Sequence, residues 1–361
     1  MIAPEDLTLL RLLAARGRFT GTEALAVARG ECAGALQALG FTTREQPFHY
    51  STAPARMGMP AVGIASFALL AIAAAIASRG WVAGAATFEI VGLVLLSLFV
   101  RWLSSSAVVL DRALDAEGVN LEATRGEEPR VWLVAHLDSK SQRFPLALRA
   151  AGASLTILAW ACMPVLLALD GRLGAHYSLV VIVGGLGAAL LGLASVGNES
   201  PGAVDNASGG VAVLAAARLL PRDAAVGVLI TDAEEMGLAG AHAWARGRSA
   251  GTAINCDTVD DTGTLMMLTS GPRALSRTVS DAAMRGARTV GVNCRVRRPP
   301  RGVLTDGVAL TRAGWSCATL GRATLGTLLR IHTRRDSVEH LEGAGIASAA
   351  ALLAAMVQEL C

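Results

Sequence analysis

The residues most able to do chemistry in this sequence are histidines and carboxylates that directly follow apolar runs. His136 and Asp138 follow the apolar run at 131–135, and Glu234 and Glu235 follow the run at 226–231. Two adjacent glutamates repel each other unless a cation or a shared proton relieves the repulsion. A metal site does so, with one glutamate binding the ion and the other activating water. The plainer alternative is a solvated turn.

Three further segments carry the same residue types. Asp205 lies in a loop before an apolar stretch, Asp257 follows the apolar run at 253–256, and His332 is followed by Asp336. Taken alone, Asp205 has an ordinary helix N-cap as its alternative interpretation, and a single His-x-Asp is weak evidence. Together the five segments offer two histidines and several carboxylates. This set suits two borderline metal ions that share a bridging carboxylate.

The segments that carry these residues alternate between strand and helix patterns. Short apolar runs at 131–135, 226–231 and 253–256 are typical of buried strands. A further strand is expected over 41–50, and helices are expected over 5–40 (two helices), 211–220, 237–246 and 343–360. The pattern predicts an α/β fold with a mostly parallel sheet sandwiched by helices. Ligands bind such sheets at the carboxyl ends of the strands.

The composition indicates that part of the chain lies in lipid. Hydrophobic residues make up 53% of the sequence and charged residues only 17%, against about a quarter charged in a typical soluble protein. Four apolar segments, 57–78, 82–100, 151–169 and 175–196, each approach the roughly 20 residues that cross a bilayer. They predict two transmembrane helical hairpins. The alternative is a set of buried core helices, and Glu89 is a cost in lipid.

Short tips, Arg79-Gly80-Trp81 and Asp170-Gly171-Arg172, join the segments in pairs, so each hairpin returns the chain to its starting side. The expected organisation is 1–56, the N-terminal part of a catalytic domain; 57–103, the first hairpin; 104–149, catalytic domain with the first metal ligand; 150–197, the second hairpin; and 198–361, catalytic domain with the remaining ligands and the base.

Basic residues favour a cytoplasmic catalytic domain on the plasma (inner) membrane, by the positive-inside rule. On the globular side they are Arg56, Arg101, Arg112, Lys140, Arg143 and Arg149, against Arg79 and Arg172 at the tips. The first residues lack the basic flank of a signal peptide. The six cysteines show no paired spacing, which fits a reducing compartment.

The net charge of +3 is small, and Lys140 is the only lysine among 32 basic residues. We therefore expect no nucleic-acid partner. The basic run at 295–301 is interpreted as a solvated loop, with a contact to anionic lipid or to a substrate carboxylate as the alternatives.

Five motifs in order resemble the M28 family of zinc aminopeptidases over most of the chain outside the hairpins. They are His136-x-Asp138, Gly202-Ala203-Val204-Asp205-Asn206-Ala207-Ser208-Gly209, Asp232-Ala233-Glu234-Glu235-x-Gly237-Leu238, Asn255-Cys256-Asp257 and His332-Thr333-x-x-Asp336. The resemblance implies a zinc exopeptidase-like fold and a di-zinc enzyme that removes N-terminal residues from peptides. The protein would then have two partners, a peptide substrate and the lipid bilayer.

The resemblance also implies a role for each matching residue. His136 and Asp257 would bind one zinc, Glu235 and His332 the other, and Asp205 would bridge both. Glu234 would be the general base, and Asp138 would orient His136. The chain departs from the family at Thr305-Asp306-Gly307, where many relatives have Ser-Asp-His. This departure leaves open what the missing histidine would contribute to the substrate pocket.

Three other functions remain open at this point. Carboxypeptidase-like, deacylating and glutaminyl-cyclising relatives share the fold and the ligands, and the cyclases use one zinc. A membrane scaffold that keeps the fold without catalysis is expected to lose a ligand or the base, and neither is lost here. Glu89 motivates a transport path through the hairpins, although a single acid among four helices gives it little support.

Overall fold

The computed structural model describes residues 2–103, 108, 114–126, 128–142, 146–169, 177–193, 195–300 and 302–361. The predicted second tip at 170–172, together with Arg112 and Arg143, lies outside these residues. The chain forms two compact units. One contains Met1–Tyr50, Asp115–Ser141 and Gly197–Cys361, and the other contains Ser51–Leu114 and Gln142–Val196.

The first unit is built on an eight-stranded sheet with the order β1-β2-β6-β3-β7-β10-β8-β9. The strands are β1 (Thr42–Ser51), β2 (Asp115–Thr124), β3 (Val131–His136), β6 (Val226–Thr231), β7 (Thr252–Val259), β8 (Leu265–Thr269), β9 (Cys294–Arg297) and β10 (Ser316–Arg322). The central strands β6, β3, β7 and β10 pair in parallel, whereas β2 and β8 pair antiparallel with β6 and β10. The sheet is therefore mixed but mostly parallel. β4 (Ser141–Gln142) and β5 (Val196–Gly197) form a separate two-stranded sheet.

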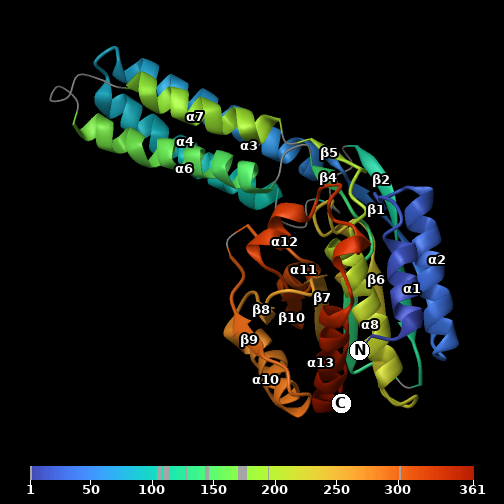
Figure 1. The fold of residues 1–361 in the computed structure, drawn as a ribbon. Coiled ribbons are helices and arrows are strands. Elements are labelled where there is room, and N and C mark those ends of the chain that lie inside the picture. Colours follow the sequence, from blue (N-terminus) through green and yellow to red (C-terminus); the bar gives the residue numbers. More distant parts are fainter. Residues whose placement is uncertain are drawn as a thin grey trace. The chain divides into compact units, whose positions relative to one another are not determined.

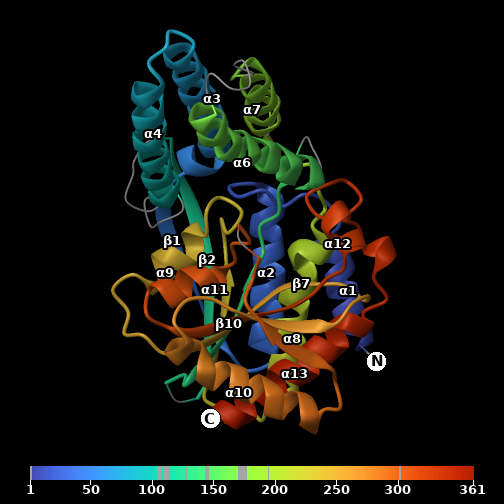
Figure 2. The same ribbon diagram turned by 90° about the vertical axis from the view of Figure 1, so that its left-hand side faces the viewer.

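Helices cover both faces of the large sheet (Figure 1, Figure 2). The helices of the first unit are α1 (Pro4–Leu13), α2 (Glu23–Ala38), α8 (Ser208–Leu219), α9 (Ala239–Ala245), α10 (Arg273–Thr289), α11 (Asp306–Arg312), α12 (Leu325–Arg330) and α13 (Ala344–Leu360), with a short helical turn at Val338–His340. Successive residues of one strand pack into two different hydrophobic cores, one on each face of the sheet. Leu133 of β3 packs with α8 and α13, and its neighbours Trp132 and Val134 pack with α9 and α11. This alternation follows from the two-residue period of a strand.

The strands and helices predicted around the functional motifs are confirmed. β3, β6 and β7 contain the three runs read as buried strands, and all residues of β3 and β6 are buried. The helices expected near 211–220, 237–246 and 343–360 are α8, α9 and α13, which begin or end a few residues from the predicted bounds. Differences of this size are usual at helix ends, which fray.

The second unit contains α3 (Ala53–Ala77), α4 (Val82–Leu103), α6 (Leu146–Ala168) and α7 (Tyr177–Gly192), which pack side by side (Figure 1). Three helices of the described chain, α3, α4 and α6, are long and apolar enough to cross a membrane. The fourth predicted segment corresponds to α7, whose 16 described residues are fewer than the roughly 20 that a span requires.

Glycines lie at close contacts between the helices of this bundle. A Cβ on Gly63 would lie 2.8 Å from the backbone oxygen of Ala188, and one on Gly187 would lie 2.8 Å from the backbone oxygen of Gly152. These positions therefore accept glycine and few other residues. Many large apolar side chains face outward, among them Ile64, Leu95 and Ile157, which are 60–68% exposed, whereas Leu70 and Met163 are buried in the bundle.

Candidate metal centre

The sheet brings the predicted site residues to one edge. β3 lies between β6 and β7 and is parallel to both, and His136 is in register with Thr231 at the end of β6. The carboxyl ends of these three strands are therefore neighbours. Glu234 and Glu235 lie just beyond the end of β6, and Asp257 lies near the end of β7.

Six of these side chains form two groups that could each hold a metal ion. The first contains His136, Glu234 and Asp257, and the second contains Asp205, Glu235 and His332; within each group the candidate ligand atoms lie within 4.8 Å of one another. All six residues are buried or nearly so. The structure thus brings together the five predicted ligands and the predicted base.

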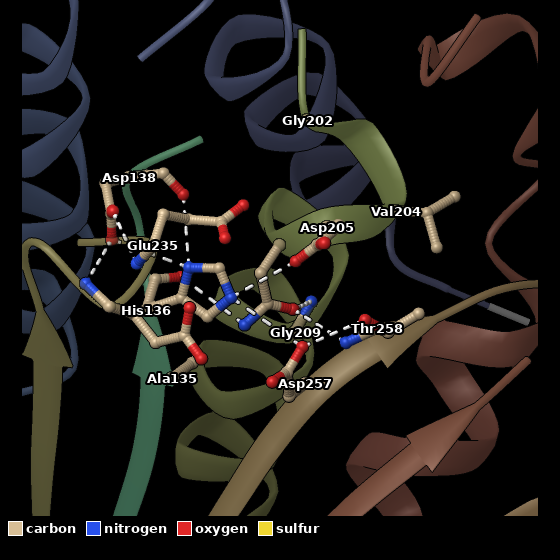
Figure 3. Close-up of polar contacts among 12 residues, drawn as sticks. Ala135, His136, Asp138, Gly202, Val204, Asp205, Gly209, Glu235, Asp257 and Thr258 are labelled. Atoms are coloured by element: carbon tan, nitrogen blue, oxygen red, sulfur yellow. Dashed lines mark hydrogen bonds and ion pairs between the residues drawn. The ribbon is translucent and has the colours of Figure 1, made fainter. Parts of the chain in front are cut away.

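Asp205 lies between the two histidines. Its Oδ1 is 3.2 Å from Nε2 of His136, and its Oδ2 is 2.9 Å from Nε2 of His332. Asp257 Oδ1 lies 3.6 Å from the same nitrogen of His136, and Glu235 Oε1 lies 3.2 Å from that of His332. Figure 3 shows the His136 ring directed toward Asp205 and Asp257. Asp205 therefore has one oxygen close to the histidine of each group, as a bridging ligand requires.

The donor atoms fit zinc. Zinc is bound by imidazole nitrogen and carboxylate oxygen in sites of three or four ligands. In the described chain, Glu235 Oε1 and His332 Nε2 are buried without a hydrogen-bond partner. Buried polar atoms are rarely left unpaired, and a metal ion between this oxygen and this nitrogen would satisfy both.

The electrostatics of the site also favour bound cations. Burial raises the pKa of Glu234 well above its usual range; His136 opposes this rise, and the carboxylates of Glu235 and Asp257 add to it. Burial alone would lower the pKa of His136, but the surrounding carboxylates raise it well above its usual value. Divalent cations would relieve the repulsion among these carboxylates and would keep the imidazoles neutral.

Asp138 holds the segment that carries both glutamates. Its Oδ1 and Oδ2 each accept a backbone N–H at 3.1 Å, one from Glu234 and the other from Glu235. Nδ1 of His136 lies 3.1 Å from the backbone oxygen of Asp138 and 3.5 Å from Oδ1 (Figure 3). A carbonyl oxygen accepts only, so Nδ1 carries the proton and Nε2 is left as the ligand atom.

We expect Asp138→Ala to weaken zinc binding by a factor on the order of 10 to 100, the usual cost of losing a residue that orients metal ligands. The measurement is zinc competition with a chromogenic chelator. Asp261→Ala is a matched control, because Asp261 also accepts backbone N–H groups, from Glu342, Gly343 and Gly345 at the start of α13. Equal zinc affinities in the two variants would refute this role for Asp138.

The turn that presents Asp205 is fixed by buried polar groups. The Asp336 carboxylate accepts the backbone N–H of Val204 at 2.7 Å and that of Asp205 at 3.2 Å. Asn206 donates to the backbone oxygen of Cys256 and accepts from the N–H of Gly209. A Cβ on Gly209 would lie 2.6 Å from the Cys256 oxygen, so this close approach of α8 to β7 requires glycine.

Two residues near the centre were not predicted as site residues. The Lys140 ammonium forms an ion pair with Glu235 Oε2, and Asp306 is fully buried and accepts a hydrogen bond from Thr231 Oγ1. Burial raises the pKa of Asp306 to about 7. Lys140 could have been found as the only lysine in the sequence, four residues after His136. Asp306 was noted only for the histidine missing after it.

His332 has a left-handed backbone, with φ of 62°. Non-glycine residues with this conformation are uncommon, and where the surrounding structure enforces it they cluster at functional sites. Here the turn around His332 is held by Thr333, whose side chain donates to the backbone oxygen of Arg330. In this strained backbone conformation, Nε2 of His332 lies 2.9 Å from Oδ2 of Asp205.

The α/β sheet sandwiched by helices is the zinc exopeptidase-like fold, and it carries two candidate metal-binding His–carboxylate groups at the carboxyl ends of its parallel strands. A family model described as "Peptidase family M28" matches residues 172–357, more than half of the chain. The chain belongs to peptidase family M28. A comparison with curated proteins finds no match.

Solved structures share the fold at low sequence identity. The zinc aminopeptidase BSAP from Bacillus subtilis is 14% identical with a TM-score of 0.56, covering 98% of this chain and 94% of its own. An aminopeptidase from Aneurinibacillus sp. strain AM-1 is 14% identical with a TM-score of 0.56, and the match covers 98% of this chain and 92% of that protein. A glutaminyl cyclase from Fimbriiglobus ruber is 14% identical with a TM-score of 0.57, and the match covers 99% of this chain and 95% of that protein. Both activities therefore occur on this fold.

Proposed function

We propose that this chain is a membrane-anchored di-zinc aminopeptidase that removes N-terminal residues from peptides. The observation that carries the proposal is the position of Asp205, which has one oxygen near His136 and the other near His332. Each group also has a carboxylate of its own, Asp257 in the first and Glu235 in the second. Two ligand sets, each with a histidine and a carboxylate of its own and joined by one shared carboxylate, favour two ions over one.

Each protein group then has a defined task. Bound zinc would supply Lewis acidity, polarising the scissile carbonyl and lowering the pKa of water. The five other residues of the two groups are assigned as metal ligands, which leaves Glu234 as the candidate base. It lies beside His136 and Asp257. It takes a proton from the attacking water and returns it to the leaving amine. Asp138 keeps His136 oriented and fixes the backbone of both glutamates.

Metal analysis together with a substrate screen tests this function. The protein purified in detergent should contain two zinc ions per chain and should release the first residue from aminoacyl and peptide substrates. One zinc per chain with cyclisation of an N-terminal glutamine would instead indicate a glutaminyl cyclase. Loss of activity with a chelator and its return with zinc would tie the reaction to the metal centre.

The membrane part of the proposal rests on the surface of the helical unit. Soluble proteins rarely expose large contiguous apolar patches, yet this bundle exposes many large aliphatic side chains, and glycines lie at close contacts between its helices. Small residues at the interfaces and large apolar residues outside are typical of helices packed in lipid. We infer a cytoplasmic catalytic unit from the basic residues that flank the helices on its side, as the positive-inside rule expects.

Cysteine labelling tests the orientation. In a background that lacks the six native cysteines, we expect Trp81→Cys, between α3 and α4, to react with an impermeant thiol reagent in intact cells. Trp81 is 75% exposed. Glu128→Cys, at an exposed position of the catalytic unit, should react only after the membrane is opened. Labelling in the reverse order would place the catalytic unit outside the cell.

A further inference from the structure

Lys140 lies beside the metal centre in the segment that follows β3. Its side chain is only 16% exposed, and its ammonium forms an ion pair with Oε2 of Glu235. Burying a lysine costs free energy unless the charge is paired, and this one is paired with a proposed metal ligand. Lys140 is also the only lysine in a chain whose other 31 basic residues are arginines. An arginine would present a broader, forked group at this position.

The two oxygens of Glu235 have different surroundings. Oε1 lies 3.2 Å from Nε2 of His332 and has no hydrogen-bond partner in the described chain, whereas Oε2 is held by Lys140. Oε1 is thus the oxygen free to bind an ion. As long as the ion pair persists, Glu235 offers one oxygen to a metal rather than two.

Lys140 also makes the two metal positions unequal. Each position has one histidine, one carboxylate of its own and a share of Asp205. The first has Glu234 as an additional carboxylate, whereas the second has the Lys140 ammonium in contact with its own carboxylate. In a partly buried site, like charges a few ångströms apart repel strongly.

We propose that Lys140 is a positioning residue that holds Glu235 as a one-oxygen ligand and makes the position of Glu235 and His332 the weaker of the two zinc sites. This inference rests on the proposed di-zinc function. Zinc then loads in order, first at His136 and Asp257 and afterwards at Glu235 and His332. At limiting zinc the protein holds a single ion.

The test is a zinc titration of metal-free full-length protein in detergent, in competition with a chromogenic chelator. Wild type should show two dissociation constants. Lys140→Met should tighten the weaker one by about tenfold or more, because a nearby positive charge is removed, and should leave the tighter one little changed. Lys140→Arg keeps the charge and should resemble wild type in affinity. Arg334→Met is the control for the loss of a positive charge, because Arg334 pairs with exposed Glu199.

The direction of the change separates this role from a merely structural one. If Lys140 only kept Glu235 in place, its loss would weaken the second site rather than tighten it. A weaker or unchanged second site in Lys140→Met, and in Lys140→Gln as a second variant, would overturn the inference while two zinc ions still bind. Wild type that binds no zinc, or a single ion at saturation, would overturn the di-zinc centre and this inference together.

Discussion

Glu234→Gln is expected to lower kcat by a factor on the order of 10² or more, as the loss of a general base does. Glutamine has nearly the shape of glutamate but does not accept a proton from water. Glu234 is fixed by its backbone N–H bond to Asp138 rather than by its carboxylate, so the exchange leaves the local chain path intact. The loss should therefore appear in kcat, with little change in KM.

Metal content is the control for this variant. The proposed ligands do not include Glu234, so Glu234→Gln should retain two zinc ions and the thermal stability of wild type. The raised pKa of Glu234 arises from burial and from neighbouring carboxylates, so the neutral amide is tolerated at this position. Near wild-type turnover would show that another group takes the proton. Loss of zinc would show that Glu234 is a ligand.

The sequence was sufficient to predict the part of the fold that carries the chemistry. β3, β6 and β7 are short, wholly or largely apolar runs, which is the pattern of parallel strands covered on both faces. Because such strands end at one edge, the convergence of His136, Glu235 and Asp257 followed from the pattern. The paired glutamates were informative for an electrostatic reason, since their repulsion implies a compensating cation.

The sheet margins were not predictable in the same way. β8 and β9 include polar or exposed residues, and β9 carries arginines that are typical of a solvated edge. The basic run at 295–301 was interpreted as a solvated loop. This was wrong for its first residues, because Cys294–Arg297 form strand β9, which pairs with β8. Edge strands are only partly buried, so the hydrophobic pattern that identifies central strands is weak there.

Contacts between side chains far apart in the sequence could not be predicted either. Asp336 and Val204 are 132 residues apart, yet the carboxylate of the first holds the backbone of the second. Lys140 was read as one of several charges flanking a hairpin, and only the fold brings it to Glu235. Spacing along the chain identifies which residues gather at a sheet edge, but pairing within the cluster depends on side-chain direction.

Asp205→Asn should have the largest effect of all, because it alters both metal positions at once. The exchange keeps the size of the side chain but removes its charge and replaces one ligand oxygen by an amide nitrogen, which is a donor and not a ligand. Changes to residues that merely orient ligands already cost 10- to 100-fold in metal affinity. A shared direct ligand should cost at least about 100-fold for each ion, or ~2.8 kcal/mol each.

The matched comparison is His136→Ala, which removes a ligand from the first group only. Asp205→Asn should reduce bound zinc toward zero and lower kcat/KM by about 10³ or more, whereas His136→Ala should retain one ion at His332 and Glu235. Both variants need a thermal unfolding measurement, and Asp336 should still hold the turn through the backbone N–H groups of Val204 and Asp205. Asp205→Asn protein that is folded and binds two zinc ions would show that Asp205 is not the bridge. In that case its two short approaches to His136 and His332 would reflect hydrogen bonding between an acid and two imidazoles.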